Sequence, residues 1–120
     1  FTVFLTIDKE PHLSNIKKRT TKMLDNGWID EVRCLLAMRE EMQINFPALD
    51  SIGYKQIIDY LNGSINKDSL IETIVNKTWQ YAKKQYKWFK KENIDLIVDI
   101  TNLEPRKVSD CIYDIYESIN

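Results

Sequence analysis

The sequence predicts an α/β fold that is mostly helical and contains two strands. Residues 1–7 and 94–100 are rich in β-branched and apolar residues, as strands are, and the segments around them repeat apolar residues at helical spacing. With 120 residues and 43% hydrophobic content, the chain is long enough for one domain with its own core. The expected order is a strand, four helices, a strand and a final helix.

The first three elements follow from local signals. The strand at 1–7 is followed by a helix that has Pro11 in its first turn and ends at an Asn-Gly pair, 26–27. A second helix is expected over about 28–41, because its apolar residues again share one face.

Turn and cap residues bound the other elements. A loop over 42–53 contains Pro and Gly, and a second Asn-Gly pair at 62–63 ends the short helix after it. Asn66 or Asp68 can cap the long helix that comes next. The remaining expected elements are, in order, helices 54–61 and 67–92, strand 94–100 and a helix that opens at Pro105.

The long helix has two contrasting faces. At 100° per residue, six lysines fall within an arc of roughly 140°. These are Lys77, Lys83, Lys84, Lys87, Lys90 and Lys91. The opposite face, expected to be buried, holds Ile74, Val75, Thr78, Tyr81, Ala82, Gln85, Trp88 and Phe89. A cationic stripe suits a phosphate backbone, although lysine on an amphipathic helix is more often a solvated surface.

Aromatic residues interleave with these lysines and could stack on unpaired bases. Tyr81, Trp88 and Phe89 are expected in the core because they lie on the apolar face. Trp79 and Tyr86 lie at the border of that face, so they are the better candidates for RNA contact.

Composition limits the classes of function. The net charge of −1 excludes a uniformly basic protein, so any nucleic-acid surface must be a local patch. Cys34 and Cys111 lack metal-site spacing and are expected as buried side chains in a reducing, cytoplasmic compartment. His12 is the only histidine, which excludes a histidine-based metal cluster within this chain. No apolar run approaches the length of a membrane span.

Three short patterns are candidate sites. Arg19 lies among lysines and could bind phosphate oxygens through its guanidinium, although a solvated basic face is commoner. The turn at 51–55 places a glycine next to the start of a helix. Its backbone amides could hold an anion, or the turn could serve only as the entry to the helix. Asp95 and Asp99 share a strand face, and solvent-facing positions explain them better than a carboxylate pair does.

The start of the chain is unusual, because Phe1 lies inside an expected strand and no methionine precedes it. Two isolated strands do not make a stable sheet. Both strands are therefore expected to pair with a portion that precedes Phe1, and the chain is expected to be a fragment.

Three longer motifs follow one another along the chain. The first is Leu13-Ser-Asn-Ile-Lys-Lys-Arg19 with Met23, Gly27 and Glu31-Val32; the second is Pro47-Ala48 with Ser51-Ile-Gly-Tyr-Lys55; the third runs from Thr78 to Lys90. In this order they resemble the C-terminal part of the tRNA dimethylallyltransferase family, also called isopentenyl-tRNA transferases. The third motif is long and specific, and the resemblance covers essentially all 120 residues.

The chain departs from the family pattern at five positions. Asn15 and Trp79 stand where the family has arginine, as do Lys84 and Lys90, and Lys87 replaces a threonine. Lysine keeps the positive charge of arginine but loses its two-pronged hydrogen bonding.

The resemblance implies an α/β, P-loop NTPase-like fold, here a mostly α-helical C-terminal fragment with two strands. Residues 1–120 would form a single C-terminal portion, and the nucleotide-binding (ATP-binding) P-loop part would be the missing N-terminal portion. The family transfers a dimethylallyl group from dimethylallyl diphosphate to N6 of adenine 37 in tRNA, usually with Mg²⁺. The complete enzyme is expected to be a cytoplasmic monomer with no membrane contact.

The resemblance also assigns site residues. The general base and the metal ligands belong to the N-terminal half, so this fragment would hold no catalytic residue and would be inactive alone. Arg19 would help to hold the diphosphate. The residues expected against the tRNA anticodon stem-loop are Asp50, Ser51, Ile52, Gly53, Tyr54, Lys55, Lys83, Lys84, Gln85, Tyr86, Lys87, Trp88, Phe89 and Lys90.

Two other interpretations stay open at this point. The chain could be a catalytically inactive, stand-alone RNA-binding remnant of such an enzyme. It could also be a helical protein-interaction module with no nucleic-acid role, which the excess of acidic residues slightly favours and the third motif argues strongly against.

Overall fold

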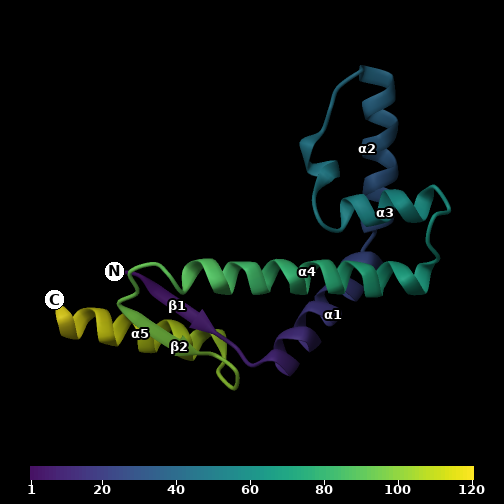
Figure 1. The fold of residues 1–120 in the computed structure, drawn as a ribbon. Helices are drawn as coiled ribbons and strands as arrows, with labels where there is room; N and C mark the ends of the chain where they lie inside the picture. The colour runs from purple at the N-terminus through teal and green to yellow at the C-terminus, as the bar shows by residue number, and fades with distance from the viewer. The chain divides into compact units, whose positions relative to one another are not determined.

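A computed structural model describes residues 1–120 as five α-helices, a short 3₁₀ helix and two strands (Figure 1). The elements are β1 (Val3–Thr6), α1 (Lys9–Asp25), α2 (Trp28–Met42), η1 (Pro47–Asp50), α3 (Tyr54–Leu61), α4 (Lys67–Phe89), β2 (Leu96–Asp99) and α5 (Pro105–Ile119). This confirms the α/β, mostly helical fold and the predicted order of strands and helices.

Cap and turn residues set most helix boundaries where the sequence predicts them. Asn66, rather than Asp68, caps α4, because its Oδ1 accepts the Ser69 N–H at 2.8 Å. The end of α4 is the clearest difference, since the helix stops at Phe89 and not at Glu92. The Glu92 N–H donates to the Phe89 carbonyl at 3.0 Å, so the chain tightens into a turn there.

The chain divides into two compact units. Unit 1 comprises residues 1–14 and 82–120, and unit 2 comprises residues 15–81. Unit 1 therefore holds both strands and α5, whereas unit 2 holds α2, η1 and α3. That residues 1–120 form a single portion of a larger enzyme stays a prediction.

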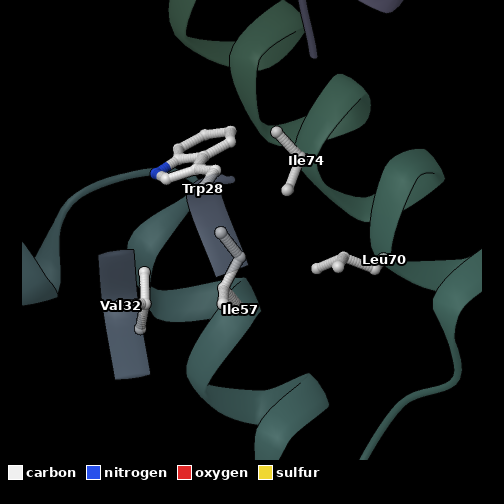
Figure 2. Packing of buried hydrophobic residues seen from close by; sticks show 5 residues of the cluster. All are labelled: Trp28, Val32, Ile57, Leu70 and Ile74. Atoms are coloured by element: carbon white, nitrogen blue, oxygen red, sulfur yellow. The ribbon is translucent and has the colours of Figure 1, made fainter. Parts of the chain in front are cut away.

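The core of unit 2 is built from five apolar side chains of α2, α3 and α4 (Figure 2). They are Trp28, Val32, Ile57, Leu70 and Ile74. Trp28 and Val32 lie one turn apart on α2, as do Leu70 and Ile74 on α4, so each helix presents one apolar stripe to the others. Burying such side chains is the main stabilising contribution to this unit.

In unit 1, β1 and β2 pair with each other as a two-stranded parallel sheet. The register joins Val3 to Leu96 and continues to Thr6 with Asp99. Each strand thus has one neighbour, supplied by a residue stretch far away in the sequence. The expectation that a portion preceding Phe1 supplies further strands stays a prediction. Leu5 and Ile97 remain 47% and 62% exposed, so this pair of strands covers little of its own apolar surface.

The two cysteines are exposed, which contradicts the prediction that they are buried. On α2 the buried side is marked by Trp28 and Val32, and Cys34 is rotated about 200° from Val32 around the helix. On α5 only Val108 is buried, so this helix packs through a narrow stripe that leaves Cys111 outside.

None of the five α-helices combines the length and the apolarity that crossing a lipid bilayer requires.

Candidate functional site

Unit 2 contains a pocket of about 710 Å³ between α1, the start of α2, the 50–54 segment and α4. This volume lies in the range of small-molecule sites. Apolar side chains form most of the wall, and one cation and one carboxylate contribute to it. The lining residues are Ile16, Arg19, Thr20, Met23, Trp28, Asp50, Ser51, Ile52, Tyr54, Ile74, Thr78 and Tyr81.

The pocket brings together two parts of the predicted site. Arg19 comes from α1, whereas Asp50, Ser51, Ile52 and Tyr54 come from the segment that joins η1 to α3. Gly53 and Lys55 belong to the same segment but do not line the pocket. The predicted diphosphate residue and four of the predicted tRNA residues thus line the same pocket.

Arg19 is an exposed residue, and no ion pair within the chain engages its guanidinium. Its neighbours on α1 include Lys17, Lys18 and Lys22, which are exposed as well. Asp50 is the only carboxylate in the pocket wall. Arg19 is the one cation of the pocket wall, and three lysines that do not line the pocket add positive charge to the same helix, so α1 can attract an anion.

The 51–54 turn has a fixed shape. Ser51 Oγ donates to the Ala48 carbonyl at 2.5 Å, which ties the turn to η1. Gly53 has φ = +94°, a conformation that other residues rarely adopt, and its N–H donates to Oε1 of buried Gln56 at 2.6 Å. Trp28 packs directly on Gly53. These contacts leave the turn little freedom to move.

Tyr54 is held from two sides. Its ring meets Trp28 edge-on, with centroids 5.6 Å apart and an interplanar angle of 81°. Its hydroxyl donates to Glu31 Oε1 at 2.8 Å. The hydrogen bond to Glu31, together with burial and the negative charge of Glu31, raises the pKa of Tyr54 above its ordinary value. The shift favours the protonated hydroxyl, which donates to Glu31.

The second predicted tRNA stretch, 83–90, lies on the last turns of α4 and on the residue after it, within unit 1. Lys83, Lys84, Lys87 and Lys90 are all exposed, in agreement with a solvent-facing cationic stripe. Gln85, Tyr86 and Phe89 line a second pocket of about 290 Å³ beside Phe4 of β1.

The apolar face of α4 is less buried than predicted. Tyr81, Trp88 and Phe89 are 54%, 62% and 39% exposed, so the expectation that they belong to the core is wrong. Phe4 contacts Phe89, with ring centroids 6.4 Å apart, and Tyr86, at 5.7 Å. Within unit 1, Phe4 covers only part of this face, so its aromatic side chains stay exposed.

The carboxylates of Asp95 and Asp99 accept hydrogen bonds from backbone N–H groups. Asp95 accepts the Thr2 N–H at 2.6 Å. Asp99 Oδ1 accepts both the hydroxyl and the N–H of Thr101, at 2.6 and 2.9 Å. The two Thr101 hydrogen bonds lower the pKa of Asp99 below its ordinary value. These carboxylates stabilise the strand ends, as the strand pattern indicates.

The residues described here do not fit a Mg²⁺ ion. No group of three or more His, Cys, Asp or Glu side chains gathers at a point that could hold a metal. In the pocket wall Asp50 has no second carboxylate beside it, and the Glu31 carboxylate already accepts the Tyr54 hydroxyl. The presence of Mg²⁺ in a complete enzyme stays a prediction.

The sequence of the chain matches a known protein family. Residues 1–92 match the family model described as IPP transferase. The chain belongs to the IPP transferase family. The predicted resemblance is therefore confirmed.

Relatives in the IPP transferase family carry names that agree with this assignment. A tRNA dimethylallyltransferase of Coprothermobacter proteolyticus is 31% identical over 115 residues, which are 95% of this chain and 36% of that protein. One of Wolbachia pipientis is 38% identical over 110 residues, which are 87% of this chain and 36% of that protein. The chain thus spans about a third of the length of these curated relatives.

Solved structures of the family share the fold. The full-length tRNA isopentenylpyrophosphate transferase of Bacillus halodurans superposes with a TM-score of 0.82 at 25% identity, over 98% of this chain and 38% of that one. The tRNA delta(2)-isopentenylpyrophosphate transferase of Staphylococcus epidermidis gives the same TM-score and identity, over 99% of this chain and 38% of that one. The predicted fold class is confirmed by these neighbours.

Sequence reasoning missed three residues that shape the pocket of this IPP transferase chain. Trp28, Glu31 and Gln56 hold the 51–54 turn but were not expected to do so. A polar residue three positions after Gly53 is a capping signal that could have pointed to Gln56. Nothing in the spacing pairs Glu31 with Tyr54, because the two residues are 23 positions apart on different helices.

Proposed function

We propose that this chain is the substrate-positioning part of a tRNA dimethylallyltransferase. Such an enzyme moves the dimethylallyl group of dimethylallyl diphosphate to N6 of adenine 37 in tRNA. The observation that carries the proposal is the pocket of unit 2, where Arg19 and the 50–54 segment meet although they are distant in sequence. Family membership and the names of the relatives support it as well.

Arg19 is proposed to hold the diphosphate. A guanidinium binds two phosphate oxygens at once, keeps its charge at any physiological pH, and is exposed here at the rim of a largely apolar pocket. A polar head bound at Arg19 would leave a short apolar chain facing side chains such as Ile16 and Met23. The pocket thus suits a ligand with an anionic end and an apolar end.

The anticodon stem-loop is proposed to contact both predicted stretches. The 50–55 segment offers a rigid turn, the Tyr54 ring and the Lys55 ammonium. Residues 83–90 offer four exposed lysines together with the exposed rings of Tyr86, Trp88 and Phe89. Lysines neutralise phosphates and aromatic rings stack on unpaired bases, which is the combination that single-stranded loops require. Both properties are sequence-tolerant, so specificity would come from the shape of the loop.

The chain's own residues would bind and orient the substrates, whereas the chemical step needs a general base and stabilisation of the leaving diphosphate. The predicted places for those groups, a P-loop portion and its neighbouring Asp, lie outside the sequence described. The resemblance to the family is also the basis for proposing that the complete enzyme is a cytoplasmic monomer.

RNA binding is tested with the 120-residue chain and a fluorescently labelled anticodon stem-loop, by anisotropy over a range of salt concentrations. The double variant Lys84→Glu plus Lys87→Glu is expected to bind more weakly and with a flatter dependence on salt, because fewer counterions are released. Arg106→Glu plus Lys107→Glu makes the same change in charge on α5, outside both predicted stretches, and should bind like the wild type. Equal loss in both pairs would contradict the assigned surface.

Anion binding is tested separately with inorganic diphosphate and isothermal titration calorimetry. Arg19→Gln is expected to weaken binding by about ten- to a hundredfold, since a charge-assisted hydrogen bond contributes about 1.5–3 kcal/mol. Lys18→Gln removes the same charge from the neighbouring position and should change binding little. Arg19→Lys should bind diphosphate with intermediate affinity, because lysine keeps the positive charge but cannot donate two parallel hydrogen bonds. If Lys18→Gln and Arg19→Gln are equivalent, the basic face is only a solvated surface.

A further inference from the structure

Glu31 contacts the pocket only through another residue. It lies on the first turn of α2 and is not among the residues of the pocket wall, whereas Tyr54 is. The Tyr54 hydroxyl reaches across to Glu31 Oε1 at 2.8 Å. The bond lies at the protein surface, and its effect is to fix the direction of the Tyr54 hydroxyl.

Glu31 is exposed like its neighbour Asp30, but the two carboxylates have different partners. Asp30 pairs with Arg33 at 2.8 Å on the same helix, and both side chains are more than half exposed. Such an i,i+3 pair contributes little and fixes nothing outside its helix. Glu31 instead joins α2 to the first residue of α3.

The hydrogen bond between Glu31 and Tyr54 acts at the point where the 51–54 turn enters α3. Tyr54 is the first residue of α3 and directly follows Gly53, which has no side chain to cap the helix. The hydroxyl bond and the edge-on contact with Trp28 together define where the ring lies. Without the acceptor, packing against Trp28 and the core of unit 2 would still oppose rotation of the side chain, but nothing would hold the hydroxyl end of the ring.

We propose that Glu31 is a positioning residue, whose carboxylate holds the Tyr54 hydroxyl and thereby fixes the Tyr54 ring and the 51–54 turn as a platform for a nucleobase of the RNA. This inference rests on the proposed RNA-binding role of the turn. Glu31 itself does not touch the RNA. Its effect on RNA affinity passes through Tyr54.

The test compares Glu31→Ala with Glu31→Gln in the 120-residue chain. Both variants remove one negative charge, so both raise the general attraction for RNA equally. Only glutamine keeps an oxygen that accepts the Tyr54 hydroxyl. The difference between the two variants therefore measures the hydrogen bond and not the charge.

Two quantities are measured for each variant, namely the affinity for the labelled anticodon stem-loop and amide hydrogen exchange along the chain. Glu31→Ala is expected to bind RNA about three- to tenfold more weakly than Glu31→Gln, as the loss of one hydrogen bond predicts. Exchange of the amides from 52 to 57 should rise in Glu31→Ala alone. Glu41→Ala, at the exposed far end of α2, is the control for removing an acidic residue from this helix.

A double-mutant comparison separates positioning from general stability. Tyr54→Phe keeps the ring and deletes the hydroxyl, so adding Glu31→Ala to it should cause no further loss of RNA affinity. An additive loss, or faster exchange throughout both units, would mean that Glu31 supports the fold and not the turn. Equal RNA affinity and equal exchange in Glu31→Ala and Glu31→Gln would overturn the inference outright.

The outcome for the wild-type chain distinguishes this inference from the proposed function. If the wild type does not bind the stem-loop, the proposed function fails and with it the nucleobase as the ligand of this platform. If the wild type binds and the alanine and glutamine variants do not differ, the proposed function stands and the role of Glu31 is wrong.

Discussion

The indole ring of Trp28 fills the space that a side chain at position 53 would need. A Cβ added to Gly53 would lie 2.1 Å from Cη2 and 2.2 Å from Cζ2 of Trp28. The same glycine has φ = +94°, so both its backbone and its surroundings exclude a larger residue.

Gly53→Ala is therefore expected to destabilise the protein by roughly 2–5 kcal/mol, the sum of backbone strain and overpacking against Trp28. Gly63→Ala is the matched control, because Gly63 also has a positive φ, of +77°, but nothing lies within 4 Å of its Cβ position. That variant should cost only about 1–2 kcal/mol. Urea unfolding followed by circular dichroism measures both values, and equal losses would show that the Trp28 contact is unimportant.

Leu70→Ala tests the core of unit 2. Leu70 has no exposed surface and packs in the cluster around Ile57, so truncation should cost about 2–5 kcal/mol through lost burial and a residual cavity. Ile119→Ala, at a position that is 64% exposed, should change the free energy of unfolding by less than about 0.5 kcal/mol. A small effect at Leu70 would mean that the cluster collapses around the gap or does not form.

Thr101→Val tests the hydrogen bonds of Asp99. The substitution deletes the hydroxyl that is the main cause of the lowered pKa, and keeps the Thr101 N–H as a weaker one. The pKa of Asp99 should therefore rise toward its ordinary value without reaching it, as a carboxyl-carbon NMR titration would record. Thr101→Ser keeps the hydroxyl and should leave the pKa low.

The same shift gives stability a defined dependence on pH. Because the pKa of Asp99 is lower when the protein is folded, its contribution is fully present above the pKa of the unfolded chain. The contribution is lost as the pH falls through the lowered pKa. The difference in stability between wild type and Thr101→Val should therefore become smaller in strong acid. It should not vanish, because the Thr101 hydroxyl also accepts the Asp8 N–H at 2.9 Å, and that bond does not depend on Asp99. A constant difference at all pH values would exclude Asp99 as its source.

Cys34 and Cys111 are exposed and free, so both should react with a thiol reagent such as Ellman's reagent in the native protein. Cys34→Ser and Cys111→Ser should each remove one reactive thiol and leave the fold intact, because neither side chain packs in the core. A thiol that reacts only after denaturant is added would contradict its exposed position.

Local signals explain why the elements could be predicted from the sequence. The Asn-Gly pairs, the Asn66 cap and Pro105 each act on the backbone next to them, so the helix boundaries near them agree with the structure. The short η1 helix was not predicted, because its four residues lie in a loop where apolar residues do not recur at helical spacing.

Long-range contacts explain what could not be predicted. Helical periodicity correctly grouped Tyr81, Trp88 and Phe89 on one face, but it says nothing about how much of that face a partner covers. For the same reason Arg19 and the 50–54 segment could be named from motifs, whereas the contacts of Trp28 and Glu31 with the turn required the three-dimensional structure.

The pairing of Val3 with Leu96 has a consequence for the order in which the chain can fold. Unit 2 is a continuous stretch that ends at Tyr81, while unit 1 needs segments from both sides of it. During synthesis unit 2 can therefore be completed while β2 has yet to emerge, and β1 must wait without its neighbour. Prior folding of unit 2 shortens the flexible chain between the strands, which reduces the entropy lost when they meet. Substitutions in the core around Ile57 should thus slow the closure of a sheet to which they contribute no residue.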